Sequence, residues 1–581
     1  MSAQSLMMSG NAASQAETPV GELDRVIAEL RDKATEFARL APREKAQLLR
    51  EQIPALRAVV EGWVASACQA KGIDPATPMA GEEWLAGPAT TMRNLRLLGQ
   101  SLEQIAASGR PPLGRAVRTR SLAGEARVEA DVFPGSAHDA ALFSGFSARV
   151  LFQPGLDEAA VRERQASFYQ RRDPVGGVSL VLGAGNVASI PPMDALYKLF
   201  VDGNVCLLKM NPVNEYLGPH FERGFAPLIR RGYLRIVYGG GEVGKYLVEH
   251  PGIDDIHITG SDRTHDLIVW GPPGPERERR RAANQPLLQK SITSELGNVS
   301  PVAIVPANYS DVELWFQARS VASMVANNGS FNCNAAKMLI TAADWAQRDE
   351  FHRLLVRALG AAPLRRAYYP GAHDRYRQLT EGRTCERLGE PGADQIAWTL
   401  ISGVDSATPD EKLFHTEPFC GILTETALPA REPEAFLSAA THFMNDRLWG
   451  TLNAAIVIHP GHERDPVIGQ ALDHAVRDLR YGTVAINHWP ALGYGLVTPP
   501  WGGHPSATLG NIQSGLGWVH NTFLLEGIEK SVVRGPLVAR PKPAWFVDNR
   551  ATDRIGRKLV AFEAAPSWFR VPGMALAALG G

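Results

Sequence analysis

The chain has no excess of charge of either sign, few cysteines and no long hydrophobic run. Its 581 residues carry 60 Lys and Arg against 61 Asp and Glu, which gives no electrostatic reason to expect a nucleic-acid partner. The five cysteines lie far apart, without a CxxC pair or a Cys/His cluster of metal-ligand spacing. We therefore expect a large, reduced protein without a metal site, rather than a small disulfide or zinc scaffold.

The sequence offers neither a targeting signal nor a membrane anchor. No stretch reaches the ~18 to 20 uninterrupted apolar residues of a membrane span. The first residues, MSAQSLMMSGNAASQAETP, lack the basic start and apolar run of a secretory signal, and also the arginines of a transit peptide. We expect residues 1–20 to be a disordered leader and the protein to be cytoplasmic.

The hydrophobic pattern changes once along the chain. From Gly21 to about Ile105, apolar residues recur at steps of three and four, which predicts two or three packed helices. From Arg172 onward, short runs that are apolar on both faces alternate with helical stretches, as in the parallel sheets of α/β proteins. The predicted strands are 177–182, 204–208, 234–238, 256–259, 302–305, 338–341, 454–458 and 483–486.

Two segments stand outside this alternation. Residues 271–286, GPPGPERERRRAANQP, are interpreted as a solvated surface loop; the alternative is a phosphate-binding role for Arg277, Arg279 or Arg280. The segment that follows Gly535 mixes prolines, aromatic residues and a short basic helix. It could close a subunit interface or a substrate entrance, or cover an exposed surface.

Two glycine motifs imitate a dinucleotide fingerprint. Gly183-x-Gly185-x-x-Ala188 and Gly239-x-Gly241-x-x-Gly244 both follow predicted strands, where glycine would let the backbone approach a pyrophosphate. Both cannot be the pyrophosphate loop of one nucleotide-binding unit. Glycine after a strand is also common simply as a turn, so neither motif decides the function alone.

The informative feature is a set of segments in fixed order. They are GNVASIPP with Asn186, NVCLLK with Lys209, GGGEVG, HITGS, SELGNVSP with Glu295, NNGSFNCNAAK with Cys333, EPF with Glu417, and VAIN with Asn487. Individually most are weak, but their shared order and spacing resemble the aldehyde dehydrogenase superfamily, over roughly 172–530.

The resemblance implies an α/β fold with two parallel-sheet Rossmann-like domains and a small β bridging element that makes dimers or tetramers. We expect a cofactor-binding domain over 21–290, with a bridging hairpin inserted near 143–172, and a catalytic domain over 291–505. A bridging and oligomerisation segment would follow at 506–535, and a C-terminal extension at 536–581.

The same resemblance assigns three catalytic residues. Oxidation of an aldehyde needs a nucleophile, because a tetrahedral adduct can release hydride and the planar carbonyl cannot. Cys333 would be that nucleophile, forming a thiohemiacetal and then a thioester. Asn186 would stabilise the oxyanion, and Glu295 would activate the water that releases the acid. Without the resemblance, the simplest interpretation of Cys333 is a small buried residue, that of Asn186 is an asparagine in a turn, and that of Glu295 is an ion-paired glutamate.

The cofactor residues also follow from the resemblance. Lys209 and Glu417 would hold ribose hydroxyls, and Phe419 would pack near the nicotinamide. Gly260 would let the backbone approach the cofactor, while Ser261 caps the next helix, so that the pyrophosphate could lie at a helix N-terminus. Pro212 stands where members that use NAD often carry a carboxylate, so the cofactor is NAD or NADP.

The sequence departs from the family near the nucleophile and leaves alternatives open. Gly329 and Cys333 are one residue further apart than usual, and an ungapped alignment would place Asn332 at the catalytic position. The Ala335 and Lys337 pattern favours Cys333. We predict NAD(P)-dependent oxidation of a small-molecule aldehyde to a carboxylic acid.

Three alternatives remain. One is a CoA-acylating enzyme, whose acyl acceptor is CoA in place of water. The second is a catalytically inactive structural homologue. The third, a plain Rossmann alcohol dehydrogenase, would leave the ordered motifs unexplained.

Overall fold

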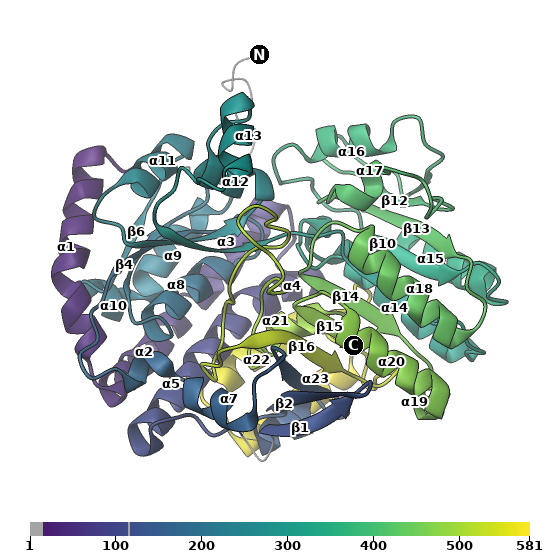
Figure 1. Ribbon diagram of the computed structural model, residues 1–581, viewed down its shortest axis with the longest axis horizontal. Coiled ribbons are helices and arrows are strands. Elements are labelled where there is room, and N and C mark those ends of the chain that lie inside the picture. Colours follow the sequence, from purple (N-terminus) through teal and green to yellow (C-terminus); the bar gives the residue numbers. More distant parts are fainter. Residues whose placement is uncertain (1–14, 114–116) are drawn as a thin grey trace.

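The first domain is built on a five-stranded parallel sheet with strand order β6-β5-β4-β7-β8. The computed structural model describes residues 15–113 and 117–581 (Figure 1). Four of these strands are predicted from the sequence, and β8 is the one that the pattern missed. The strands are β4 (Val178–Leu182), β5 (Val205–Lys209), β6 (Leu234–Val237), β7 (Asp255–Gly260) and β8 (Ser291–Leu296).

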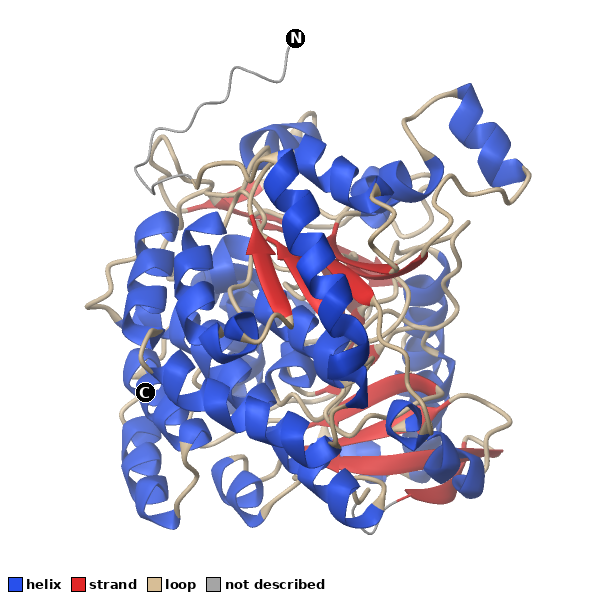
Figure 2. Cartoon of the chain, turned by 90° about the vertical axis from the view of Figure 1, so that its left-hand side faces the viewer, coloured by secondary structure: helices blue, strands red, loops and turns tan. Residues whose placement is uncertain are grey.

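Helices cover this sheet (Figure 2), and several of them come from the N-terminal part of the chain (Figure 1). The buried stripe Leu23, Val26, Ile27 and Leu30 of α1 recurs at helical spacing and lies against β4, β5 and β6. The expected two or three helices are α1 (Val20–Arg39), α2 (Pro42–Arg57), α3 (Val60–Lys71) and α5 (Thr90–Ser108), with the short α4 (Gly81–Trp84) and π-helix η2 (Leu85–Ala89) before α5.

The second domain is built on an eleven-stranded sheet whose central seven strands are parallel. Helices α14 (Asp311–Ala326), α15 (Arg348–Gly360), α18 (Pro433–Asp446) and α20 (Pro466–Asp478) pack against it. The parallel strands are β9 (Pro301–Ile304), β10 (Met338–Ala342), β12 (Trp398–Ile401), β13 (Ile422–Leu428), β14 (Asn453–Val457), β15 (Thr483–Ile486) and β16 (Ile528–Arg534), and β11 (Glu386–Leu388) is antiparallel at the edge.

Shorter helices complete the two domains. They are α6 (Ala137–Leu142), α7 (Glu158–Arg164), α8 (Ile190–Phe200), α9 (Gly218–Gly224), α10 (Ala226–Arg230), α11 (Gly241–Glu249), α12 (Asp262–Trp270), α13 (Pro275–Ala282), α16 (Ala372–Thr380), α17 (Lys412–His415), α19 (Pro460–Arg464), α21 (Ala491–Gly495), α22 (Thr552–Ala564) and α23 (Val571–Leu579). Within the described ranges, no helix has the length and hydrophobicity that a membrane crossing requires.

The bridging element begins earlier than the sequence predicts. Antiparallel strands β1 (Val117–Leu122), β2 (Glu125–Phe133) and β3 (Ser147–Phe152) extend the second sheet through β16. Only β3 falls within the predicted 143–172. The charged residues of β1 point to solvent, so its sequence carries no buried alternation that would reveal a strand. Because β8 belongs to the first sheet, the domain boundary also lies after Leu296 and not after residue 290.

The predicted leader and loop both hold regular structure in part. Residues 1–14 of the leader lie outside the described part, but Thr18 exchanges two hydrogen bonds with the backbone of Tyr238. The predicted surface loop contains helix α13, which buries none of its residues. In that helix Arg279 and Arg280 pair with Glu276, so the surface position is confirmed while the loop conformation is wrong.

The C-terminal extension packs on the N-terminal helices. Helix α22 crosses α4 at two glycines: a Cβ at Gly81 would lie 2.3 Å from the backbone of Thr552, and one at Gly556 would lie 2.5 Å from Cβ of Trp84. Arg557 covers the ring of Trp84, 4.4 Å from its centroid. The extension is therefore a fixed part of the fold.

Gly556→Ala is expected to destabilise the protein, although alanine is the better helix former. The added methyl must displace Trp84, and overpacking of this kind costs about 1 to 3 kcal/mol. Gly573→Ala is the matched control, because its Cβ would meet only the flexible end of Lys558 at 3.5 Å; it should be neutral or stabilising by up to ~1 kcal/mol. Thermal unfolding measures both. Equal stability gains in the two variants would contradict the close packing of α22 on α4.

Candidate functional site

A large cavity lies at the carboxyl edge of the five-stranded sheet. Parallel strands end at the same edge, so Lys209 at the end of β5 and Gly260 at the end of β7 both line it. Ser261 follows as the N-cap of α12, where its hydroxyl accepts a hydrogen bond from the N–H of Thr264. The cavity measures about 1410 Å³ and extends from these strand ends to Cys333.

Two helices begin at this cavity, and glycines keep their starts open. A Cβ at Gly240, Gly241 or Gly244 would meet open space, so the start of α11 leaves room for a bound group. Helices α11 and α12 direct unpaired N–H groups and positive dipole ends to the cavity, as an anion such as pyrophosphate requires. These residues fit a dinucleotide.

The first glycine motif is used differently. A Cβ at Gly185 would lie 2.8 Å from the side chains of Asn211 and Val213, and one at Gly183 would lie 3.1 Å from Pro191. These glycines allow the chain to pack closely against its own neighbours. Gly183 lines the cavity too, but only the motif that starts α11 has glycines, Gly241 and Gly244, at which a Cβ would meet open space.

Two carboxylates, those of Glu215 and Glu17, place negative charge near Lys209. Lys209 is buried and burial lowers its pKa, while the carboxylates of Glu215 and Glu17 act to raise it. Pro212 lines the same cavity, as its position three residues after Lys209 suggests. The negative charge near Lys209 thus comes from Glu215, close by in the sequence, and from the distant Glu17.

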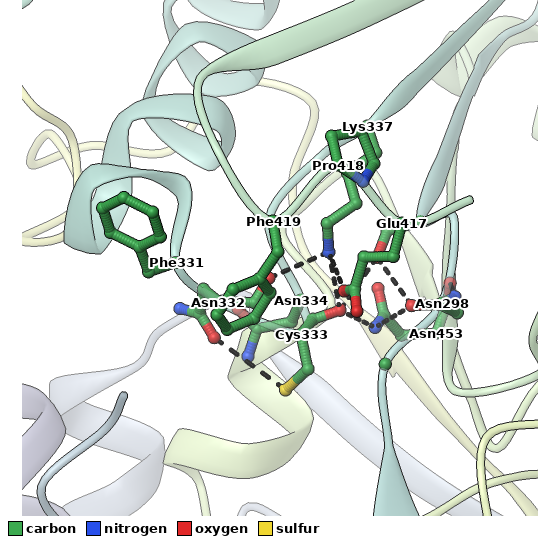
Figure 3. Close-up of polar contacts among 12 residues, drawn as sticks. Asn298, Phe331, Asn332, Cys333, Asn334, Lys337, Glu417, Pro418, Phe419 and Asn453 are labelled. Atoms are coloured by element: carbon green, nitrogen blue, oxygen red, sulfur yellow. Dashed lines mark hydrogen bonds and ion pairs between the residues drawn. The ribbon is translucent and has the colours of Figure 1, made fainter. Parts of the chain in front are cut away.

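Cys333 lies in the loop between α14 and β10, and its backbone is held firmly. The loop turns through three residues with positive φ: Asn328, Gly329 and Ser330. The carbonyl oxygen of Cys333 then accepts hydrogen bonds from Ser300 Oγ at 3.0 Å, Lys337 Nζ at 3.2 Å and Asn453 Nδ2 at 3.4 Å (Figure 3). The extra residue of this loop is therefore accommodated in a fixed turn.

The thiol of Cys333 lies near the carboxyl of Glu295, and its Sγ donates a hydrogen bond to Asn332 Oδ1 at 3.9 Å (Figure 3). Trp501 Nε1 donates to Glu295 Oε1 at 3.2 Å and orients this carboxyl. Burial raises the pKa of Glu295 to about 8, and burial together with the Glu295 charge raises the pKa of the Cys333 thiol. At neutral pH both groups hold their protons, and Glu295 becomes a carboxylate that can accept a proton only as the pH rises through about 8.

Asn186 reaches the same loop from the end of β4. Its Nδ2 donates to the carbonyl of Phe331 at 3.2 Å, two residues before Cys333. Its own carbonyl accepts hydrogen bonds from Lys71 and Asn328. Asn186 lines the large cavity together with Cys333, which brings the predicted nucleophile and oxyanion donor to one site.

Glu417 and Phe419 form the opposite wall of the cavity. Glu417 Oε1 accepts a hydrogen bond from Lys337 Nζ at 2.6 Å, and a Cβ at Gly297 would lie 1.8 Å from Glu417 Oε2, so this carboxylate needs the glycine (Figure 3). Phe419 has a φ of 44°, and its ring packs edge-on to Tyr369 at 4.9 Å. Both side chains are fixed by protein neighbours.

A second cavity meets the first at the catalytic pair. It measures about 510 Å³ and is mostly apolar, and Cys333 and Glu295 line both cavities. Asn332, the alternative nucleophile position, lines only the second. The thiol thus stands in the wall between a glycine-lined polar cavity and an apolar one, an arrangement that favours Cys333 over Asn332.

Comparison with known proteins relates part of the chain to a known family. Residues 135–367 match the sequence model of the aldehyde dehydrogenase family. The matched segment holds the five strands of the first sheet and the Cys333 loop.

Solved structures share the aldehyde dehydrogenase fold over most of the chain. An NAD-dependent aldehyde dehydrogenase from Sinorhizobium meliloti is 18% identical, with a TM-score of 0.58 over 91% of this chain and 89% of that one. An aldehyde dehydrogenase from Mycobacterium tuberculosis complexed with NAD+ is 17% identical, with a TM-score of 0.58 over 89% and 91%. An NADP-dependent glyceraldehyde-3-phosphate dehydrogenase from Bacillus halodurans C-125 is 18% identical, with a TM-score of 0.57 over 89% and 91%.

The sequence did not point to three further residues of this candidate site. Lys337 was noticed only as part of a pattern, yet it bonds both Glu417 and the Cys333 loop. Trp501 lies far along the chain from Glu295, and only the fold brings them together. Asp194 is buried on α8, and its charge helps to raise the pKa of Glu295. None of the three has a local sequence signal for these roles.

Glu295→Gln is expected to make the stability of the protein less dependent on pH. The pKa of Glu295 is raised on folding, from about 4.5 to about 8, so between these values the folded state binds more protons than the unfolded state. Stability from this group is complete below pH 4.5 and falls as pH rises to 8. Unfolding free energies should therefore shift in favour of the Gln variant across that window, by roughly 2 to 5 kcal/mol. A constant difference between the two proteins from pH 5 to 8 would show that Glu295 titrates normally.

Proposed function

We propose that this protein oxidises an aldehyde to a carboxylic acid with NAD(P)+ as the hydride acceptor. The observation that carries the proposal is the position of Cys333 and Glu295, which line both a cavity that fits a dinucleotide and an apolar cavity. An aldehyde bound in the apolar cavity would meet the thiol from one side, with the cofactor on the other. No metal is needed for this chemistry.

The first step is proton removal and attack. The Glu295 carboxylate takes the proton of the Cys333 thiol, and the sulfur forms a bond to the aldehyde carbon. The carbonyl π electrons move to oxygen, which leaves a tetrahedral thiohemiacetal with one negative charge. Burial makes the thiolate costly until it reacts, so attack follows directly on proton transfer.

Asn186 would stabilise the charge on the oxygen. Its Nδ2 lies at the Cys333 loop and carries two hydrogens. One is donated to the carbonyl of Phe331. The other would be donated to the oxyanion that forms above the thiol. We assign the backbone N–H of Cys333 as the second donor. Three hydrogen bonds to the Cys333 carbonyl fix the position of this residue in the chain.

The cofactor supplies a nicotinamide ring that accepts the hydride when the thiohemiacetal carbon becomes the carbonyl of a thioester. We assign its pyrophosphate to the starts of α11 and α12, including Gly260 and Ser261. Lys209 and Glu417 would bind the ribose hydroxyls, and Phe419 would pack near the ring.

Hydrolysis completes the reaction. Glu295 first releases the thiol proton to solvent and is a carboxylate again. It then accepts a proton from water, the hydroxide oxygen bonds the thioester carbon, and the sulfur leaves as a thiolate that takes this proton from Glu295. The direct contact of Glu295 with Cys333 favours water over CoA as the acyl acceptor, since thiolysis does not need this base. Assembly into a homodimer or homotetramer and a cytoplasmic location stay predictions.

Cys333→Ala is expected to abolish aldehyde-dependent NAD(P)H formation, because no other group at the site can form the thiohemiacetal. The assay follows cofactor absorbance with a panel of aldehydes and with NAD+ or NADP+. Cys385→Ala is the matched control: Cys385 lies away from both cavities and should keep wild-type activity. Wild-type rates in the Cys333 variant would refute the nucleophile assignment.

Glu295→Gln is expected to slow deacylation by about 10²- to 10⁴-fold, the usual contribution of a general base. Acylation slows as well, because Glu295 also takes the thiol proton, so the variant is incubated for a long time with excess aldehyde and NAD(P)+ before intact-protein mass spectrometry detects the acyl group on Cys333. In wild type, the rate should rise with pH through about 8, as the Glu295 carboxyl ionises. Formation of acyl-CoA instead of the free acid, when CoA is added to the wild-type enzyme, would contradict hydrolysis.

A further inference from the structure

The apolar cavity beside Cys333 is built largely by the C-terminal extension, residues 536–581. More than a third of the residues that line it come from this extension. Pro543 and Trp545 contribute from the segment before α22, Ile555 and Leu559 from α22, and Met574 from α23. The part of the chain that sequence motifs left unexplained therefore shapes the space in front of the nucleophile.

The rest of the cavity wall is also apolar. Leu142, Phe143 and Phe146 line it from the segment between β2 and β3, and Leu492 and Leu496 from the segment that includes α21. These side chains offer contact to a hydrocarbon and no charge to a polar chain.

Arg540 lines the wall but is exposed to solvent, and the other charged side chains of the wall already have partners in the protein. Glu82 pairs with Arg365 at 2.8 Å. Asp194 accepts a hydrogen bond from Thr259 at 2.8 Å, and Lys542 Nζ donates to the carbonyl of Asp548 at 2.9 Å. A substrate with a charged tail would thus find these groups occupied.

A buried ion cluster holds the wall together. Arg93 on α5 pairs at 2.9 Å with Glu563 of α22 and with Asp139 of α6, and its Nε donates to the carbonyl of Leu496 at 2.8 Å. Arg96 also pairs with Glu563. All three lining segments therefore meet at one buried guanidinium, which makes the extension a rigid wall.

The cavity opens beside α23. Leu579 lines the cavity and is also 73% exposed, so it stands at the mouth. Trp568, just before α23, stacks on His138 of α6 at 4.3 Å and closes the extension against that helix. A long chain could extend from Cys333 along the apolar wall toward solvent at Leu579.

We propose that the C-terminal extension makes this enzyme selective for aldehydes with a long, uncharged hydrocarbon chain. The proposal rests on the oxidation of aldehydes proposed above and adds the substrate class. Each methylene that enters the cavity leaves water, and its burial is worth about a fourfold gain in binding. Short aldehydes reach Cys333 but leave the wall formed by the extension unused, and anionic aldehydes lose their hydration without gaining a partner.

The first experiment measures kcat/KM for acetaldehyde, hexanal, decanal and succinic semialdehyde with the full-length enzyme. We expect kcat/KM to rise by at least 100-fold from acetaldehyde to decanal, and succinic semialdehyde to lie at least 10-fold below hexanal. A flat series, or a preference for succinic semialdehyde, would overturn the substrate class while leaving aldehyde oxidation intact. If no aldehyde is oxidised, the proposed function itself fails.

The second experiment tests the role of the extension with two substitutions on one helix. Met574→Trp narrows the cavity and should lower the decanal-to-acetaldehyde ratio of kcat/KM by at least 10-fold. Leu576→Trp adds the same side chain at a position that is 71% exposed and outside the cavity lining, and should leave the ratio unchanged. Thermal unfolding confirms that both variants are folded.

The two variants give distinct answers. A lower ratio in the Met574 variant alone supports the proposal. Equal ratios in both variants and wild type would show that the chain does not lie along α23, and would overturn it. Ile555→Trp on α22 repeats the test on the other helix of the wall, so that poor folding of one variant does not decide the result.

Discussion

Burial of the Cys333 thiol against the Glu295 carboxyl is the constraint on which the rest of the site depends. Either group would cost free energy if it were charged alone in this environment, and burial raises the pKa of both. Both groups therefore keep their protons at neutral pH. The surrounding polar groups, Trp501 on Glu295 and Lys337 on the loop carbonyls, orient the pair without neutralising it.

The Cys333 and Glu295 pair lies between two cavities with different linings. On one side lie helix starts, glycines and the Lys337–Glu417 ion pair, which suit a charged dinucleotide. On the other side lie aromatic and aliphatic side chains from three distant segments. The first side is built by the superfamily fold, and the second by a C-terminal extension held in place by Arg93, so substrate selection and cofactor binding are handled by different parts of the chain.

Much of the fold could be predicted from the sequence, because buried parallel strands form short apolar runs that are easy to recognise. The runs that became β4, β5, β7 and β9 are apolar on both faces, and the catalytic motifs follow their ends in fixed order. Strand β1 could not be predicted, since its charged residues face solvent. The sequence of helix α13 is typical of a loop because the helix has no buried face. Its start and end are marked only by a proline and by ion pairs.

The site was less predictable than the fold. Ordered motifs gave Cys333, Glu295 and Glu417, but tertiary partners such as Trp501 and Arg93 depend on contacts between segments hundreds of residues apart. The Pro212 argument for NADP considered a single position, whereas the charges near Lys209 come from Glu215, close by in the sequence, and from Glu17. Only the contribution of the distant Glu17 has no local signature.

The central claim, that Cys333 faces the cofactor on one side and the aldehyde chain on the other, is tested most directly by a crystal structure of the Glu295→Gln variant trapped with NAD(P)+ and decanal. The account predicts cofactor density along the starts of α11 and α12, with an acyl chain bonded to Cys333 and lying against α22 and α23. An acyl chain in the glycine-lined cavity, or a cofactor in the apolar one, would contradict it.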